Sequence, residues 1–286
     1  MATQSIPYSL RRNEAVRPGL VRILNSMGRD VRELSEKPEG DLEKSIHDIR
    51  TLIKRLRAYL WFLRPTTGKI FYKQGNACLR KAARRLSKTR DLHAVASALT
   101  KAAVPATNEV HLQALVEVSQ AFAQTVAAQK KDKNLRKLEK VADTVIQVML
   151  KIVIVLERNA EDVPSPRHRL KKIFKLTRKA VKKTLRKKDP LFVHEWRKKT
   201  KRLFYILQLT AQVPGMGMSD CLRQVDKLQE KLGDFQDNTV AKDHLCFQSP
   251  HIEEALVRRT IHLLRKNQKI LLKEAHHCWD AVVEKI

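Results

Sequence analysis

Apolar side chains recur every three or four residues along almost the whole chain, the spacing that places them on one face of an α-helix. No stretch of the sequence shows the two-residue alternation that is typical of a β-strand. Prolines, glycines and short polar runs divide the pattern into long segments. These segments predict helices over residues 9–36, 41–63, 69–101, 107–130, 133–160, 167–188, 189–212, 219–247 and 251–285. We therefore expect an all-α protein.

Local signals support several of the predicted helix ends. Asp41 and Asp189 each precede a helical segment, and aspartate accepts hydrogen bonds from the free backbone N–H groups of a first turn. Pro190 follows Asp189 directly, and proline is favoured in a first turn because no N–H is needed there. The run Pro214-Gly215-Met216-Gly217 predicts a loop.

Charge is the outlier in the composition. Among 286 residues, Lys and Arg number 58 against 30 acids, for a net charge of +28. Like charges repel one another in a folded protein and destabilise it, so a net charge of this size indicates an anionic partner. DNA, RNA, an acidic membrane surface and a polymer of phosphate all remain candidates on this ground alone. The longest apolar run, residues 145–156, is interrupted by Lys151 and is too short to span a bilayer, so we expect no membrane insertion.

A short motif occurs twice and predicts a duplicated chain. Residues 47–60 and 194–207 share the pattern His-x-x-Arg-x3-Lys-Arg at an offset of 147. Residues 86–91 and 232–237 match at an offset of 146. Two ordered matches at nearly one offset predict halves of about four helices each, related by an approximate two-fold axis. We place the first repeat at about 9–131 and the second at about 133–286, in one domain over 1–286.

Each motif copy forms a stripe of cations beside the apolar face of its helix. At 100° per residue, His47, Arg50, Lys54 and Arg57 share one side over a length of ~15 Å. Arginine offers phosphate a planar fork and lysine a point charge, so a linear polyanion can run along such a ladder. The candidate polyanion-binding residues are His47, Arg50, Lys54, Arg55, Arg57, Lys81, Arg84, Arg85, Lys88, His194, Arg197, Lys198, Lys201, Arg202, Tyr205, Lys227 and Lys231.

The two motif histidines have two open interpretations. His47 and His194 either contact phosphate, or hydrogen-bond within the bundle and orient a neighbouring cation. We predict no metal site, because neither helix has a second ligand three or four residues further on.

The repeated motif and the trailing Leu-Ser/Gly…Asp elements resemble those of the CHAD domain, the conserved histidine α-helical domain, over roughly residues 10–286. The resemblance implies two pseudo-symmetric four-helix bundles around a basic central groove. It also implies binding of inorganic polyphosphate and association with polyphosphate granules, which predicts a cytoplasmic location. Gln236 stands where the first copy has Arg90, so the second copy departs from the Arg-Asp element.

Catalysis finds little support in the sequence, so we expect a binding protein without a cofactor. No GxxxxGK[ST], GxGxxG, HExxH or nucleophile-elbow motif occurs, and acids are sparse around both motif copies. The alternative is non-specific binding of nucleic acid at low salt, which the same charge supports. Helix-turn-helix, RRM, KH and zinc-finger signatures are absent, and the sequence names no protein partner.

The stripe hypothesis predicts the outcome of a charge reversal in both motif copies. Replacing Lys54 and Lys201 together by Glu should abolish polyphosphate binding while helical content, measured by circular dichroism, stays unchanged. If the double variant still binds polyphosphate tightly, the two cationic stripes are not the binding site.

Overall fold

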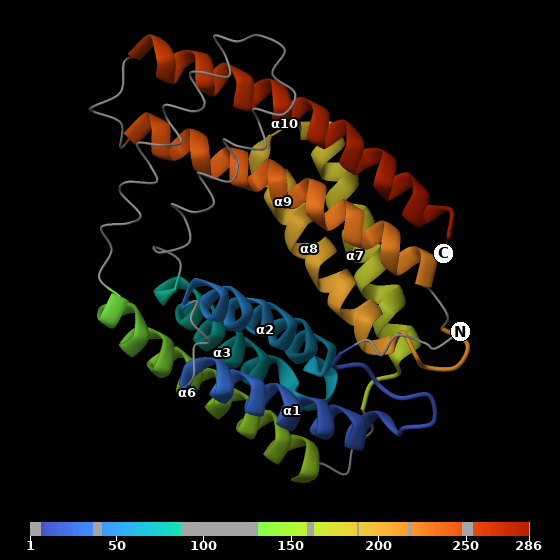
Figure 1. Cartoon of the computed structure of the whole chain (residues 1–286). Helices are drawn as coiled ribbons and strands as arrows, with labels where there is room; N and C mark the ends of the chain where they lie inside the picture. The colour runs from blue at the N-terminus through green and yellow to red at the C-terminus, as the bar shows by residue number, and fades with distance from the viewer. Residues whose placement is uncertain are drawn as a thin grey trace, which may run out of the picture. The chain divides into compact units, whose positions relative to one another are not determined.

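The computed structural model describes residues 7–36, 42–86, 131–158, 163–187, 189–216, 219–247 and 254–285. All regular secondary structure in these ranges is α-helix, as Figure 1 shows, so the prediction of an all-α fold is confirmed. The helices are α1 (Val16–Glu36), α2 (Leu42–Phe62), α3 (Arg64–Arg85), α6 (Lys131–Arg158), α7 (Pro166–Lys187), α8 (Pro190–Thr210), α9 (Ser219–Phe247) and α10 (Glu254–Val283). The helix predicted over 107–130 lies outside the described residues.

The chain divides into two compact units. The first contains α1, α2, α3, α6, α7, α8 and the start of α9 up to Val225, and the second contains the rest of α9 and α10. Within the first unit α6 packs against α1 and α3, and α7 packs against α8. α2 packs against α8 as well as α3, so the two helices that carry the repeated motif are neighbours. The duplication and its boundary near residues 131–133 stay predictions.

The apolar faces of the motif helices form part of the core, as their spacing predicts. Ile49, Ile53 and Leu56 of α2 and Trp196 and Leu203 of α8 are each fully buried. Burying one such side chain contributes about 1.5–3 kcal/mol through the hydrophobic effect. The core therefore fixes the rotation of each helix about its axis, and with it the direction of the cationic stripe.

The first helix begins at Val16, so the prediction of helix from residue 9 is wrong for residues 9–15. A helix running through this segment would need Pro18 to donate a backbone hydrogen bond, and proline has no N–H. Starting at Val16 places Pro18 in the first turn, where no donor is required. We call residues 7–15 the N-terminal strap.

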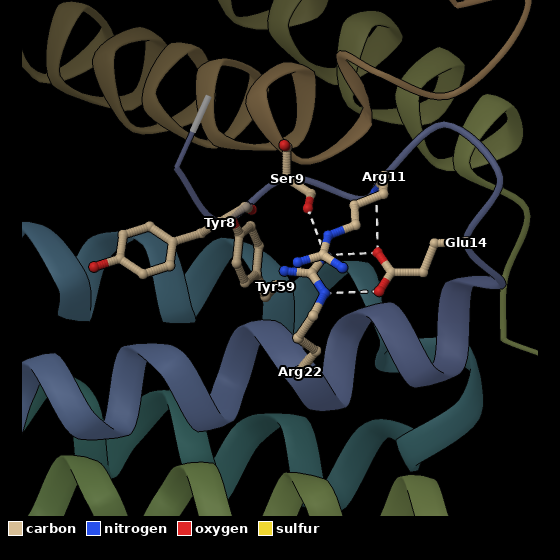
Figure 2. A network of polar contacts seen from close by, with 6 residues as sticks. All are labelled: Tyr8, Ser9, Arg11, Glu14, Arg22 and Tyr59. Atoms are coloured by element: carbon tan, nitrogen blue, oxygen red, sulfur yellow. Dashed lines mark hydrogen bonds and ion pairs between the residues drawn. The ribbon is translucent and has the colours of Figure 1, made fainter. Parts of the chain in front are cut away.

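The N-terminal strap is held by side chains of α1 and the backbone of α8. The Leu10 N–H donates to the Leu209 carbonyl at 2.9 Å, and the Leu10 side chain is fully buried. Figure 2 shows the Arg22 guanidinium of α1 between the Ser9 carbonyl and the Glu14 carboxylate, at 2.9 Å and 2.6 Å. A Cβ at Gly19 would lie 2.6 Å from a Leu10 side-chain carbon, so a larger residue here would require the Leu10 and Glu14 side chains to shift.

Two helix starts follow their local sequence signals. The Leu191 N–H donates to the Asp189 carboxylate at 2.8 Å, which confirms the predicted N-cap. α3 begins at Arg64, earlier than predicted, but its helical geometry is interrupted at Gly68, where φ is +81°. That backbone angle favours glycine, and the regular helix continues beyond it, in agreement with the predicted start at residue 69.

In the second unit, polar side chains join α9 to α10. Gln268 donates to the Phe235 carbonyl at 3.1 Å and to the Thr239 hydroxyl at 2.7 Å, while its own carbonyl oxygen accepts from Lys242 at 2.7 Å. This buried amide therefore ties three positions of α9 to α10.

The ion pair in the strap predicts a pH-dependent stability. Arg22 lowers the pKa of Glu14 to about 2, so the contribution is complete above pH 4.5 and is lost as pH falls from there toward 2. The Arg22 side chain is 34% exposed. After discounting for screening, Glu14→Gln should lower the free energy of unfolding by about 1–2 kcal/mol at pH 7.

Urea unfolding of both proteins from pH 7 to pH 2.5 measures the difference. The gap between wild type and Glu14→Gln should narrow as pH falls below 4.5. A gap that stays constant over this range would show that the Glu14 carboxylate does not stabilise the strap by its charge.

Candidate functional site

The first motif copy lies along α2 beside α3. His47 is exposed, while Arg50, Lys54 and Arg57 are partly buried. Arg50 Nη1 donates to the Ala83 carbonyl of α3 at 2.7 Å, and Arg57 Nε donates to the Asn76 side-chain oxygen at 2.9 Å. These contacts hold the two arginines between α2 and α3.

The second motif copy lies on α8. His194, Arg197 and Lys201 are partly buried. Lys198 is exposed, and its ammonium forms an ion pair with Glu195 at 2.7 Å, which lowers the pKa of Glu195. The Glu195 carboxylate also favours the charged forms of Lys199 and Arg202 on the same helix.

Arg55 occupies the crossing of α2 and α8 and is 7% exposed. Its Nη1 donates to the Pro7 carbonyl at 3.0 Å, and its Nη2 donates to the Gln208 side-chain oxygen at 3.1 Å. Its guanidinium carbon is 4.6 Å from the ring centroid of Tyr8 and 5.4 Å from that of Tyr205. Arg55 therefore joins α2, α8 and the N-terminal strap, and Tyr205 is buried against it; their contact with ligand stays a prediction.

Arg202, the counterpart of Arg55 in the second copy, reaches back to the first copy. Its guanidinium carbon is 5.1 Å from the Trp61 ring centroid, and its side chain hydrogen-bonds to Tyr72 of α3. The pairs Arg55–Gln208 and Arg202–Trp61 are related by the motif offset of 147 residues. Such reciprocal contacts are expected of two copies related by a two-fold axis.

Five arginines from four helices lie near one another where α2 and α8 meet. We call them the arginine cluster, and they are Arg57, Arg64, Arg80, Arg169 and Arg202. Arg169 of α7 is 2% exposed, donates through Nη2 to the Trp61 carbonyl and lies 3.8 Å above the Trp61 ring centroid. Arg64 lies 5.6 Å from the Tyr72 ring centroid. Three members of the cluster thus contact the Trp61 and Tyr72 rings, and the charge of Glu195 acts on Arg202.

The cluster is strongly electropositive. Burial, followed by repulsion from Arg64 and Arg202, lowers the pKa of Arg169 to about 10. Burial, followed by repulsion from Arg202 and Arg80, lowers the pKa of Arg57. Arg169 still carries its charge at neutral pH, because its pKa remains well above 7. None of the ion pairs between described residues joins a carboxylate to this cluster.

Comparison with known proteins identifies the family. A family model of the CHAD domain matches residues 26–246, a range that includes both motif copies. The chain belongs to the CHAD domain family. The crystal structure of the CHAD domain from the plant Ricinus communis is similar, with a TM-score of 0.71 and 17% sequence identity over 99% of this chain and 96% of that one. At that identity the likeness shows a shared fold. A search of curated proteins found no match.

The remaining candidate residues of this CHAD domain lie in different surroundings. Lys81, Arg84 and Arg85 are exposed on α3, and Lys88 lies outside the described residues. In the second unit Lys227 is exposed, and Lys231 forms an ion pair with Glu274 at 2.8 Å, which raises the pKa of Lys231.

Arg64 and Arg169 are not among the candidate residues predicted from the sequence. Arg169 precedes the buried Ile173 by four residues and Thr177 by eight, so helical spacing already places it on the buried side of α7. A cation on an apolar face is the signal that could have found it. Arg64 gives no comparable signal, because it follows the turn at Leu63 rather than a regular helix.

The described ranges contain no group of three or more His, Cys, Asp or Glu side chains placed to hold a metal ion. No helix in these ranges is both long and apolar enough to cross a membrane.

The contacts of Arg55 predict a stability role that an exposed cation lacks. Arg55→Ala removes two charged hydrogen bonds and two cation–π contacts, so it should lower the free energy of unfolding by about 2–4 kcal/mol. Arg85→Ala, on the exposed side of α3, should change it by less than about 0.5 kcal/mol. Urea unfolding of the two variants checks this, and equally small effects would contradict the structural role of Arg55.

Proposed function

We propose that this CHAD domain protein binds inorganic polyphosphate along the motif cations of α2 and α8. The observation that carries the proposal is the junction of the two motif copies. Arg202 of the second copy reaches the ring of Trp61, which lies one turn after Arg57 at the end of the first stripe. Burial, followed by repulsion from Arg202, lowers the pKa of Arg57. Cations of the two helices therefore form one connected set where α2 and α8 meet.

A linear polyphosphate fits such a set because it carries negative charge at short, regular intervals. Arg57 and Arg202 offer planar forks to successive phosphate groups, and Lys54 and Lys201 offer point charges. Bound phosphate would also relieve the repulsion between the arginines. A net charge of +28 supports the same partner by attracting it over longer distances.

The proposed role is binding rather than catalysis. Phosphoryl transfer normally needs carboxylates that hold Mg²⁺, and the arginine cluster has arginines and aromatic rings instead. Membership of the CHAD domain family supports a polyphosphate-related role. We propose that the protein acts at cytoplasmic polyphosphate granules, as a granule-associated or scaffolding protein.

Calorimetric titration tests the proposed ligand. Long-chain polyphosphate and duplex DNA of equal total charge are titrated into the protein at physiological salt and again at a higher salt concentration. We expect polyphosphate to bind at least about ten-fold more tightly than DNA, because a flexible chain can follow partly buried cations that a rigid duplex cannot reach.

A DNA affinity equal to or above that of polyphosphate would overturn the proposal. The motif cations would then act as a general polyanion surface, and non-specific nucleic-acid binding would become the function to pursue. In that case the affinity for DNA should also fall steeply between the two salt concentrations, because binding to a general polyanion surface releases counterions.

A further inference from the structure

A groove lies between α1 and α6, and neither of these helices carries a copy of the repeated motif. The two helices pack side by side, as Figure 1 shows, and Arg17 of α1 joins them by donating to the Leu156 carbonyl at 3.2 Å. We call it the α1–α6 groove. Its volume of about 370 Å³ is within the range of protein binding pockets. Its lining includes Leu24, Gly28, Arg29, Arg32, Met149 and Leu150.

The floor of the α1–α6 groove is apolar and continues into an apolar stripe on α6. Leu24 and Met149 are buried, whereas Leu150 is 46% exposed and Ile154, one turn further along α6, is 43% exposed. With Ile146 they form a stripe at four-residue spacing that is about 12 Å long. Exposed apolar residues that adjoin one another at a groove are typical of an interaction site. A partner helix matches such a stripe, because its own apolar side chains recur every three or four residues.

Gly28 keeps the α1–α6 groove open. A Cβ at this position would have only the Met149 sulfur within 4 Å, at the ordinary contact distance of 3.9 Å, and the backbone does not have a positive φ. Alanine would therefore fit the fold, and it is favoured over glycine within a helix because glycine loses more backbone freedom on folding. Packing within the described chain does not require glycine here, whereas the close approach of a partner does.

Arg29 and Arg32 give the α1–α6 groove its charge. Both are exposed and lie three residues apart, so they extend from neighbouring turns of α1 along the same groove. Neither arginine takes part in an ion pair with another described residue. The described residues that line the groove include no acid. A complementary partner therefore has acidic groups beside apolar ones.

We propose that the α1–α6 groove binds an amphipathic helix of a partner protein, with apolar side chains on one face and acidic side chains beside them. The apolar face packs on Met149 and Leu150, and the carboxylates pair with Arg29 and Arg32. A second copy of this chain fits less well, because a two-fold contact through this face brings like charges together. Polyphosphate has no apolar groups to cover the floor, so the inference does not depend on the proposed function.

Fluorescence anisotropy with a labelled model peptide tests the α1–α6 groove. The peptide is about five helical turns long, with leucines on one face and glutamates beside them. A control peptide contains the same residues in an order that gives no apolar face, so its charge is identical. Both are titrated with the full chain in the presence of long-chain polyphosphate, which competes for binding through charge alone. We expect the amphipathic peptide to bind at least about ten-fold more tightly, and equal affinities would overturn the proposal.

Matched substitutions locate the binding surface. Leu150→Glu removes an apolar contact and places a negative charge beside the acidic peptide, so it should weaken binding by about ten-fold or more. Leu185→Glu makes the same change at an exposed position of α7 and should leave the affinity unchanged. Arg32→Gln should weaken binding by about three-fold or more, unlike Arg178→Gln at an exposed position of α7. Equal effects within either pair would show that the peptide does not bind in the groove.

Gly28→Ala separates binding from folding. The added methyl group occupies the α1–α6 groove, so the affinity for the amphipathic peptide should fall by about five-fold or more. The midpoint of thermal unfolding should stay the same or rise, because alanine favours the helix. An unchanged affinity in this variant would contradict the close approach of a partner helix to Gly28.

Two other occupants of the α1–α6 groove give different results. Self-association of the wild type that Leu150→Glu abolishes, measured by sedimentation velocity, would assign the groove to a second copy of the chain. Co-sedimentation with phosphatidylglycerol vesicles that Leu150→Glu abolishes and Leu185→Glu preserves would assign it to a membrane surface. Either result would overturn the acidic helix as the occupant.

Discussion

The crossing of α2 and α8 is the constraint on which the candidate site depends. Arg55 closes one side of it through hydrogen bonds to Pro7 and Gln208, and Trp61 supports Arg202 on the other. Because both helices also bury apolar faces, neither can rotate without exposing core residues. The motif cations are therefore held in place by packing before any ligand arrives, which lowers the entropic cost of binding.

The two sides of this crossing are built differently although the motif is the same. The N-terminal strap supplies a carbonyl and an aromatic ring to Arg55. Both terminal nitrogens of that arginine donate to the protein, while its buried Nε has no hydrogen-bond partner among the described residues. Around Arg202 the additional groups include other arginines, so positive charge accumulates there although Tyr72 and Glu195 partly offset it. Like charges held this close in a folded protein store a cost that an anion can offset. Arg55 thus contributes stability to the crossing, while Arg202 and Arg57 of the first copy contribute to its electropositive surface.

The helical content, the duplicated motif and the buried faces of α2 and α8 could be predicted from residue spacing. Apolar periodicity encodes these features locally, and the Asp189 cap is local as well. The N-terminal strap could not be predicted, because its position depends on a carbonyl of Leu209, far away in sequence. The different contacts of Arg55 and Arg202 could not be predicted either. The two residues occupy equivalent positions of the repeated motif, and only their neighbours in the folded chain differ. The burial of Arg169 could have been predicted, because helical spacing places this cation on the apolar face of α7.

A crystal structure of the protein grown with long-chain polyphosphate tests the central claim most directly. We expect phosphate groups in contact with Lys54 and Lys201, continuing to Arg57 and Arg202 beside the Trp61 ring. Phosphate density confined to the exposed lysines of α7, with the α2–α8 crossing unoccupied, would contradict it.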